Sequence, residues 1–133
     1  MAVQLSVAVR NARLDQVEAI AGTSVKLRLL SGAVEANCAA ADSGTLLCEM
    51  TLPSDWMNAA SGGQKTLLGS WTGTGIGGGG TIAHFRIKDS AGTTCHLQGT
   101  VGVGSGDMSL DNNVIANGQT VTVNSFTLTD GNA

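Results

Sequence analysis

From Ser24 onwards, apolar residues recur at every second position in short runs, and Gly, Asn, Asp or Ser separates one run from the next. Val25, Leu27 and Leu29 form one such run, and residues 46–52 form another. Successive side chains of a β-strand point to opposite faces, so a period of two predicts strands with one buried face. About seven such strands, with turns about every 8 to 15 residues, are typical of an antiparallel β-sandwich or jelly roll. The expected fold class is therefore all-β, with one exception.

The exception is the segment 6–21, SVAVRNARLDQVEAIA, which predicts an α-helix with Ser6 as N-cap and Gly22 as its C-terminal stop. One side of this helix carries an imperfect apolar stripe edged by two arginines: Val3, Val7, Leu14, Val17 and Ala21, with Arg10 and Arg13. A competing interpretation makes residues 3–9 a strand, because its valines and leucine alternate with other residues. We divide the chain into a helical arm at residues 1–22 and a β-sandwich domain at residues 23–133.

The clearest predicted hairpin spans residues 81–101. If residues 90–92 are a three-residue loop that ends with Gly92 in the left-handed conformation, Asp89 lies opposite Thr93. The predicted pairs are then Ile87 with Cys95, Phe85 with Leu97 and Arg86 with His96. This register keeps all apolar residues on one face. It places His84, Arg86 and Lys88 on an outward, solvated face.

Two further segments carry turn signals. Asn117-Gly118 predicts a turn into a final strand at residues 119–129, in which the apolar residues change from odd to even positions, so we expect a β-bulge near residues 124–125. Residues 72–80, TGTGIGGGG, predict a mobile or tightly bent loop. Its G-x-G-x-x-G pattern is followed by a predicted strand instead of a helix, so we do not expect a nucleotide site.

Composition and charge argue against several classes of partner. Seven Lys and Arg against ten Asp and Glu give a formal net charge of −3, and the chain has two Trp, two Phe and no Tyr. Binding to nucleic acid needs concentrated positive charge and exposed aromatic rings. No apolar run approaches the roughly 18 residues of a membrane span, and the N-terminus lacks the pattern of a signal peptide. We therefore expect no nucleic-acid or membrane partner and a reducing, cytosolic origin.

The residue types that carry catalysis or bind metals form no specific pattern. Cys38, Cys48, Cys95, His84 and His96 lack the spacing of zinc motifs. Cys48 and Cys95 are expected as buried free thiols and Cys38 as the exposed one, with a Cys38–Cys48 bridge left open. The carboxylates are scattered over predicted loops and outer faces. The expectation is a non-enzymatic protein with no metal and no other cofactor.

Trp56 and Trp71 have two interpretations. Each is flanked by small residues and can close one end of the β domain, which we favour. Either ring can instead form an open stacking platform for a sugar or a protein.

Four segments resemble a recurrent family of small tailed-phage and prophage proteins that belong among virion structural genes: AVQLSVAVRNARLDQVEAI, LPSDWMNAASGG, HFRIKDSAGTTCHLQGTV and VTVNSFTLTDGN. The likeness covers most of the chain, but residues 72–80 are richer in glycine than in that family. The resemblance implies a structural component of the virion, assembled in the host cytoplasm. By wider analogy it implies a capsid cement or decoration protein that binds the major capsid protein and forms homo-oligomers, with a trimer as the guess.

The functional expectation is therefore a head cement protein. The alternatives are a tail or fibre-tip component that contacts the host surface, and a carbohydrate-binding module. The speculative interface comprises Val7, Arg10, Arg13, Leu14, Val17, Trp56 and Trp71. Two roles of the helix stay open, because it either reaches a neighbouring subunit as an arm or closes one end of its own domain.

Overall fold

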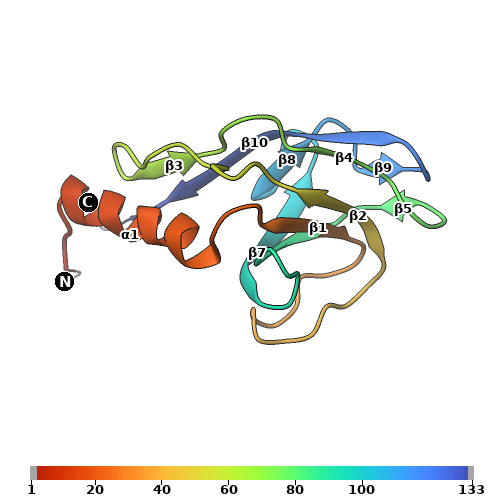
Figure 1. Ribbon diagram of the computed structural model, residues 1–133, viewed down its shortest axis with the longest axis horizontal. Helices are drawn as coiled ribbons and strands as arrows, with labels where there is room; N and C mark the ends of the chain where they lie inside the picture. The colour runs from red at the N-terminus through yellow and green to blue at the C-terminus, as the bar shows by residue number, and fades with distance from the viewer. Residues whose placement is uncertain (1–2, 132–133) are drawn as a thin grey trace.

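The computed structural model describes residues 3–131 (Figure 1). These residues form one helix and ten strands: α1 (Val7–Ala21), β1 (Lys26–Leu30), β2 (Leu46–Thr51), β3 (Gln64–Thr66), β4 (Thr72–Thr74), β5 (Gly80–Thr81), β6 (His84–Lys88), β7 (Cys95–Gly102), β8 (Met108–Leu110), β9 (Val114–Ile115) and β10 (Thr120–Thr129). The protein is mostly β with one N-terminal helix, as the sequence predicts.

Helix α1 has the predicted caps. The Ser6 hydroxyl accepts a hydrogen bond from the Val9 amide at 3.2 Å, and the Gly22 amide donates to the Glu18 carbonyl at 2.9 Å. Gly22 has a φ of 92°, a conformation that ends a helix at little cost only for glycine. The strand alternative for residues 3–9 is wrong, because the backbone is already helical from Val7.

Eight of the strands form one curled sheet with the order β2-β1-β6-β7-β8-β10-β3, in which β4 also pairs with β10. The pair β7–β8 is parallel, and β5 and β9 form a separate small sheet. The sheet curls far enough for Cys48 of β2 to bridge to Gly75 beyond β4, and the Ile76 amide donates to the Leu47 carbonyl at 2.9 Å. This half-barrel of mixed pairing differs from the expected two antiparallel layers, because alternation shows which face of a strand is buried but not which strand lies beside it.

The concave side of the curled sheet holds one core. A chain of aromatic rings crosses it, with centroid distances of 5.4 Å between Phe85 and Phe126, 5.7 Å between Phe126 and Trp71, and 6.0 Å between Trp71 and Trp56. Val25, Leu27 and other alternating residues pack around these rings. The expectation that both tryptophans pack in the core is confirmed.

The bulge in the last strand is also confirmed. Val123 pairs with Leu110, but Ser125 pairs with Ser109, so Asn124 is the extra residue. Val121, Val123 and Phe126 are all buried as a result. The turn before this strand forms at Gly118, whose φ is 81°.

The predicted register of the β6–β7 hairpin is wrong by two residues. Ile87 pairs with Leu97, Arg86 with Gln98 and Phe85 with Gly99. The Asp89 carboxylate accepts hydrogen bonds from the amides of Thr93 and Thr94, which lengthens the loop, and the pairing shifts again between Ile87 and Lys88. A shift of two residues leaves Leu97 on the predicted face, so facial agreement could not distinguish the two registers. The further shift of one residue places Cys95 opposite Lys88, so Cys95 is half-buried on the polar face and not buried in the core as predicted. Gly92 has the predicted positive φ, at 74°.

The glycine-rich segment is a tightly bent connection between β4 and β5. A Cβ at Gly75 would collide with the carbonyl oxygen of Ala116, so only glycine fits where this segment crosses the chain after β9. Strand β5 follows the segment. The helix that a dinucleotide fingerprint requires is therefore not formed.

Candidate functional site

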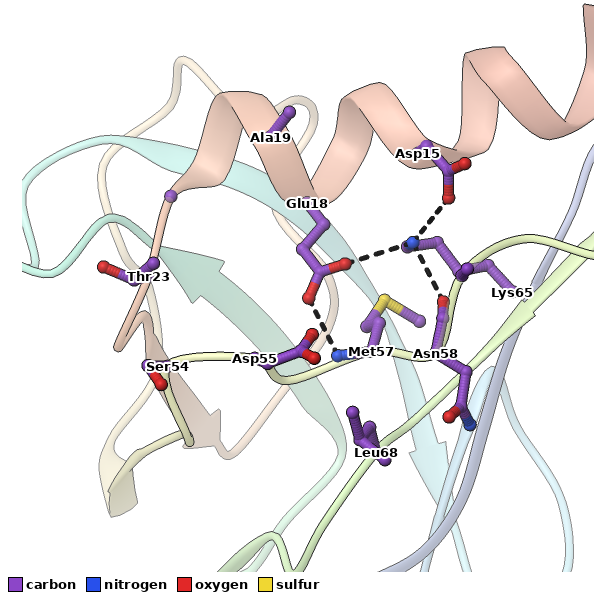
Figure 2. Close-up of a pocket in the computed structure, with 12 residues that line it drawn as sticks. Asp15, Glu18, Ala19, Thr23, Ser54, Asp55, Met57, Asn58, Lys65 and Leu68 are labelled. Atoms are coloured by element: carbon purple, nitrogen blue, oxygen red, sulfur yellow. Dashed lines mark hydrogen bonds and ion pairs between the residues drawn. The ribbon is translucent and has the colours of Figure 1, made fainter.

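A hollow of about 620 Å³ lies between α1 and the segment 54–68 (Figure 2). Asp15 and Glu18 point into it from the helix, and Asp55, Asn58 and Lys65 meet them from the opposite wall. Met57 and Leu68 line the rest of the hollow. It therefore combines an apolar wall with an unusual concentration of charge.

Glu18 joins the helix to the opposite wall through both of its carboxylate oxygens. Oε2 accepts hydrogen bonds from the amides of Trp56 and Met57, at 3.1 and 3.0 Å. Oε1 lies 3.1 Å from Lys65 Nζ. A carboxylate that satisfies two backbone amides and a cation is a strong connection, because charged hydrogen bonds are about twice as strong as neutral ones.

Lys65 is the cation at the centre of this arrangement, and its side chain is only 1% exposed. Its Nζ contacts Asp15 Oδ1 at 2.8 Å and the Asn58 carbonyl at 3.0 Å, in addition to Glu18. Burial alone would lower the pKa of Lys65, but the hydrogen bonds to Asp15 and Glu18 outweigh burial and raise it. The hydrogen bond from Lys65, followed by that from the Ala60 amide, lowers the pKa of Asp15. Lys65 therefore stays charged and is saturated with acceptors.

Asp55 lies at the exposed mouth of the hollow beside Glu18 (Figure 2). The neighbouring Glu18 carboxylate is the main cause of a raised pKa of Asp55. Two carboxyl groups in contact disfavour simultaneous ionisation. The polar groups that line the hollow thus contact one another. These contacts attach the helix to the rest of the protein.

Comparison with known proteins gives no relative for this chain. No protein-family model, no curated protein and no solved structure matches it. Within residues 3–131, no helix has the length and apolar character needed to cross a membrane. In the same range, no three His, Cys, Asp or Glu side chains gather closely enough to hold a metal ion.

A second hollow of about 310 Å³ lies on the outer side of α1, where the helix meets β7. Val17 and Ile20 of the helix and Leu97 of β7 give it an apolar lining, and Arg13, Gln16 and His96 complete it. Ile20 is 67% exposed. We name this hollow the outer groove.

The structure separates the residues of the predicted interface. Leu14 is buried against the protein's own sheet, Val17 is half-buried in the outer groove and Val7 is exposed. Arg10 Nη1 donates to the Asp130 carbonyl at 3.3 Å, and Arg13 Nε lies 3.2 Å from the Asp130 carboxylate. Only Leu14 and Ala21 of the predicted apolar stripe are buried, whereas Val3 and Val7 are exposed. Both arginines contact the protein's own C-terminal segment.

Trp56 and Trp71 do not form part of an exposed surface, which corrects their place in the predicted interface. The two side chains are 0% and 1% exposed. Trp56 Nε1 donates to the Gly22 carbonyl at 2.9 Å, and Trp71 Nε1 donates to the Leu68 carbonyl at 3.1 Å. Neither ring offers an open face to a sugar, so the stacking platform that motivated a carbohydrate-binding module does not exist in this structure.

The polar face of β6 is buried, although the sequence pattern places it in solvent. The loop 31–45 covers it, and His84, Arg86 and Lys88 all lie beneath this loop. Arg86 Nη1 and Lys88 Nζ contact Asp42 Oδ1 at 2.6 and 2.8 Å. Burial alone would raise the pKa of Asp42, but hydrogen bonds from Lys88, Arg28 and Arg86 hold it far below the usual range.

Sequence reasoning missed both the charged hollow and the outer groove. Asp15 and Glu18 occur three residues apart on the predicted helix, which indicates a shared face, but no sequence signal connects them to Lys65. The signal for the outer groove was the spacing of Arg13, Gln16 and Ile20, which recur every three or four residues along the helix.

Proposed function

We propose that this protein is a non-enzymatic structural component of a tailed-phage virion, a head cement protein that binds the capsid through the outer groove. The observation that carries the proposal is the unusual orientation of α1. Its inner side is tied to the domain by polar side chains such as Asp15 and Glu18, while Ile20 lies in solvent at 67% exposure. Large exposed aliphatic side chains on an otherwise polar surface are typical of protein-binding sites.

The groove offers the elements of a small protein–protein contact. Val17, Ile20 and Leu97 supply an apolar centre, and Arg13 and His96 supply a polar rim. The groove is formed on one rigid helix and one strand, so a partner does not need to order it on binding. An apolar side chain of a capsid subunit inserted between Ile20 and Leu97 is the occupant that we propose.

The resemblance to phage virion proteins supplies the biological setting, in which the particle assembles in the host cytoplasm and the partner is the major capsid protein. Homo-oligomers, with a trimer as the simplest form by analogy, would present several grooves to the capsid at once. We also infer that the curled sheet packs in the manner of a β-sandwich, with its two halves facing each other across the core. The contact between Phe85 of β6 and Phe126 of β10 across the core supports this inference.

The test is cosedimentation of the purified protein with empty particles of its cognate major capsid protein. The wild-type protein should sediment with the particles, and Ile20→Lys should lose binding because a charge would enter the apolar centre of the contact. Val114→Lys is the matched control. Val114 is 59% exposed on β9, at the opposite end of the molecule from α1, so its replacement should leave binding unchanged (Figure 1).

Two results would contradict the proposal. Equal binding by Ile20→Lys and wild-type protein would exclude the outer groove as the contact. Failure of the wild-type protein to sediment with capsids would exclude the cement role, and binding to purified tails or fibres instead would favour the tail or fibre-tip alternative.

A further inference from the structure

Two of the three cysteines lie together in the structure. Cys38 belongs to the loop 31–45 and Cys95 is the first residue of β7, and both line one hollow of about 300 Å³. The Cys38 thiol lies close enough to Cys95 to influence the pKa of the Cys95 thiol. Cys48 is different, because it is fully buried in the core. Sequence reasoning left open a Cys38–Cys48 bridge, whereas the fold brings Cys38 to Cys95.

The neighbourhood of the two thiols is fixed by polar contacts of the loop with β6 and β7. Arg86 Nη2 donates to the Cys38 carbonyl at 3.0 Å, and Gln98 Nε2 donates to the Glu35 carbonyl at 2.8 Å. These bonds hold the backbone of Cys38 over the sheet. The contact between the two thiols therefore depends on an anchored loop.

The two cysteines differ in their chemical environment. Cys95 Sγ donates to the Leu97 carbonyl at 3.2 Å. Burial, followed by the effect of the neighbouring Cys38 thiol, raises the pKa of Cys95 to about 11. Cys95 is therefore protonated at neutral pH. The Arg86 guanidinium lies beside it, and its buried Nε lacks a hydrogen-bond partner among the described residues. This charge can stabilise a thiolate at Cys95 when its proton leaves.

We propose that Cys38 and Cys95 form a reversible intramolecular disulfide that fixes the loop 31–45 to β7. The oxidant is a small disulfide of the glutathione class. The Cys38 thiolate attacks one sulfur of the oxidant and releases one thiolate, which leaves a mixed disulfide on Cys38. Cys95 then loses its proton to solvent and attacks the Cys38 sulfur, and the second thiolate leaves. The two protons from the cysteines end on the two released thiols, so two electrons pass from the protein to the oxidant.

The experiment treats the reduced, full-length protein with oxidised glutathione at about pH 8, near the ordinary pKa of a thiol. The reaction is quenched with acid and free thiols are alkylated. The mass of the intact protein should show the loss of two hydrogens, and only one of the three cysteines should carry the alkyl group. Cleavage before aspartate separates the three cysteines, because Asp42 lies between Cys38 and Cys48 and Asp89 precedes Cys95. The expected product joins the peptide 15–41 to the peptide 89–106.

Three variants test the order of the steps. Cys95→Ser should stop at glutathione attached to Cys38, and Cys38→Ser should prevent the internal disulfide and react with glutathione more slowly. Cys48→Ala is the matched control and should still form the bridge. In the wild-type protein, the oxidised form should unfold at a higher urea concentration than the reduced form, because the bridge restricts the unfolded chain.

A cross-link between Cys48 and either other cysteine would overturn the proposal. A disulfide between two protein chains, or glutathione left on Cys38 of the wild-type protein at equilibrium, would overturn it as well. The peptide map of the wild-type protein decides among these results even if a variant fails to fold.

Discussion

Phe85 on β6 lies directly opposite Gly99 on β7, and a Cβ at position 99 would approach the phenylalanine ring to 2.8 Å. The same Cβ would lie 2.8 Å from the Asp107 carboxylate, which binds the amide of Thr100. The ring of Phe85 therefore fills the space that a side chain would take on the neighbouring strand. This pair links the hairpin register to the packing of the aromatic core.

Gly99→Ala should accordingly destabilise the protein. The new methyl group forces the Phe85 ring or the Asp107 loop to move, and overpacking of this kind costs about 1–3 kcal/mol. Urea denaturation followed by tryptophan fluorescence measures the loss. Gly78→Ala is the control, because a Cβ there meets no atom within 4 Å and its backbone does not require glycine. Equal midpoints for the two variants would contradict the observed register.

Glu18→Gln should weaken the attachment of α1. The glutamine carbonyl oxygen can still accept from the Trp56 and Met57 amides, which share one oxygen of Glu18, but its NH2 group then points at the Lys65 ammonium. Lys65 also loses one of its two carboxylates. An unsatisfied donor at a largely buried site costs about 1–3 kcal/mol in the free energy of unfolding. Glu49→Gln makes the same chemical change in a partly exposed pair with Arg28, where a loss below about 1 kcal/mol is expected. Comparable losses in both variants would show that Glu18 has no special role.

Stability should depend on pH in opposite ways through Asp55 and Asp89. The contact with Glu18 raises the pKa of Asp55 above the ordinary 3.8, so its contribution to stability is present below that value and is lost as pH rises through the folded-state pKa. Hydrogen bonds from Thr93, the amide first, lower the pKa of Asp89, so its contribution is present above 3.8 and is lost as pH falls through the folded-state pKa.

Asp55→Asn should therefore raise the urea midpoint at pH 7, and Asp89→Asn should lower it. Both effects should shrink below about pH 3.8, where the carboxyl groups of the unfolded chain are protonated. The two variants make the same change in net charge, so each controls for the other. Shifts in the same direction would contradict the contact between Asp55 and Glu18.

Deletion of residues 2–21 should unfold the protein, since the helix covers part of the core with Leu14 and supplies the acceptors for Lys65 and the 56–63 segment. Loss of the near-ultraviolet circular dichroism of the buried tryptophans measures the effect. Ile20→Ser is the control and should keep the native spectrum, because Ile20 lies outside the core. A folded truncated protein would instead support the division into a helical arm and an independent β domain.

The sequence alone was enough for several local features, although not for the register of the β6–β7 hairpin. The caps of α1 at Ser6 and Gly22 and the bulge beside Asn124 depend on residues that are near neighbours in the chain, and all three were predicted from them. The burial of Val25 and Leu27 likewise follows from alternation within one strand. Each of these features is decided by backbone conformation or side-chain spacing over a few residues.

The order of the strands, the buried polar face of β6 and the meeting of Cys38 with Cys95 were decided only by tertiary structure. Arg86 lies on a polar face that the sequence pattern assigns to solvent, and it is buried because the loop 31–45 folds back and offers the Asp42 carboxylate and three carbonyl groups. The pairing of Glu18 with Lys65 depends in the same way on where the helix is placed on the sheet. A periodic pattern records only the polarity of each face, whereas the partner of a face depends on contacts between residues far apart in the chain.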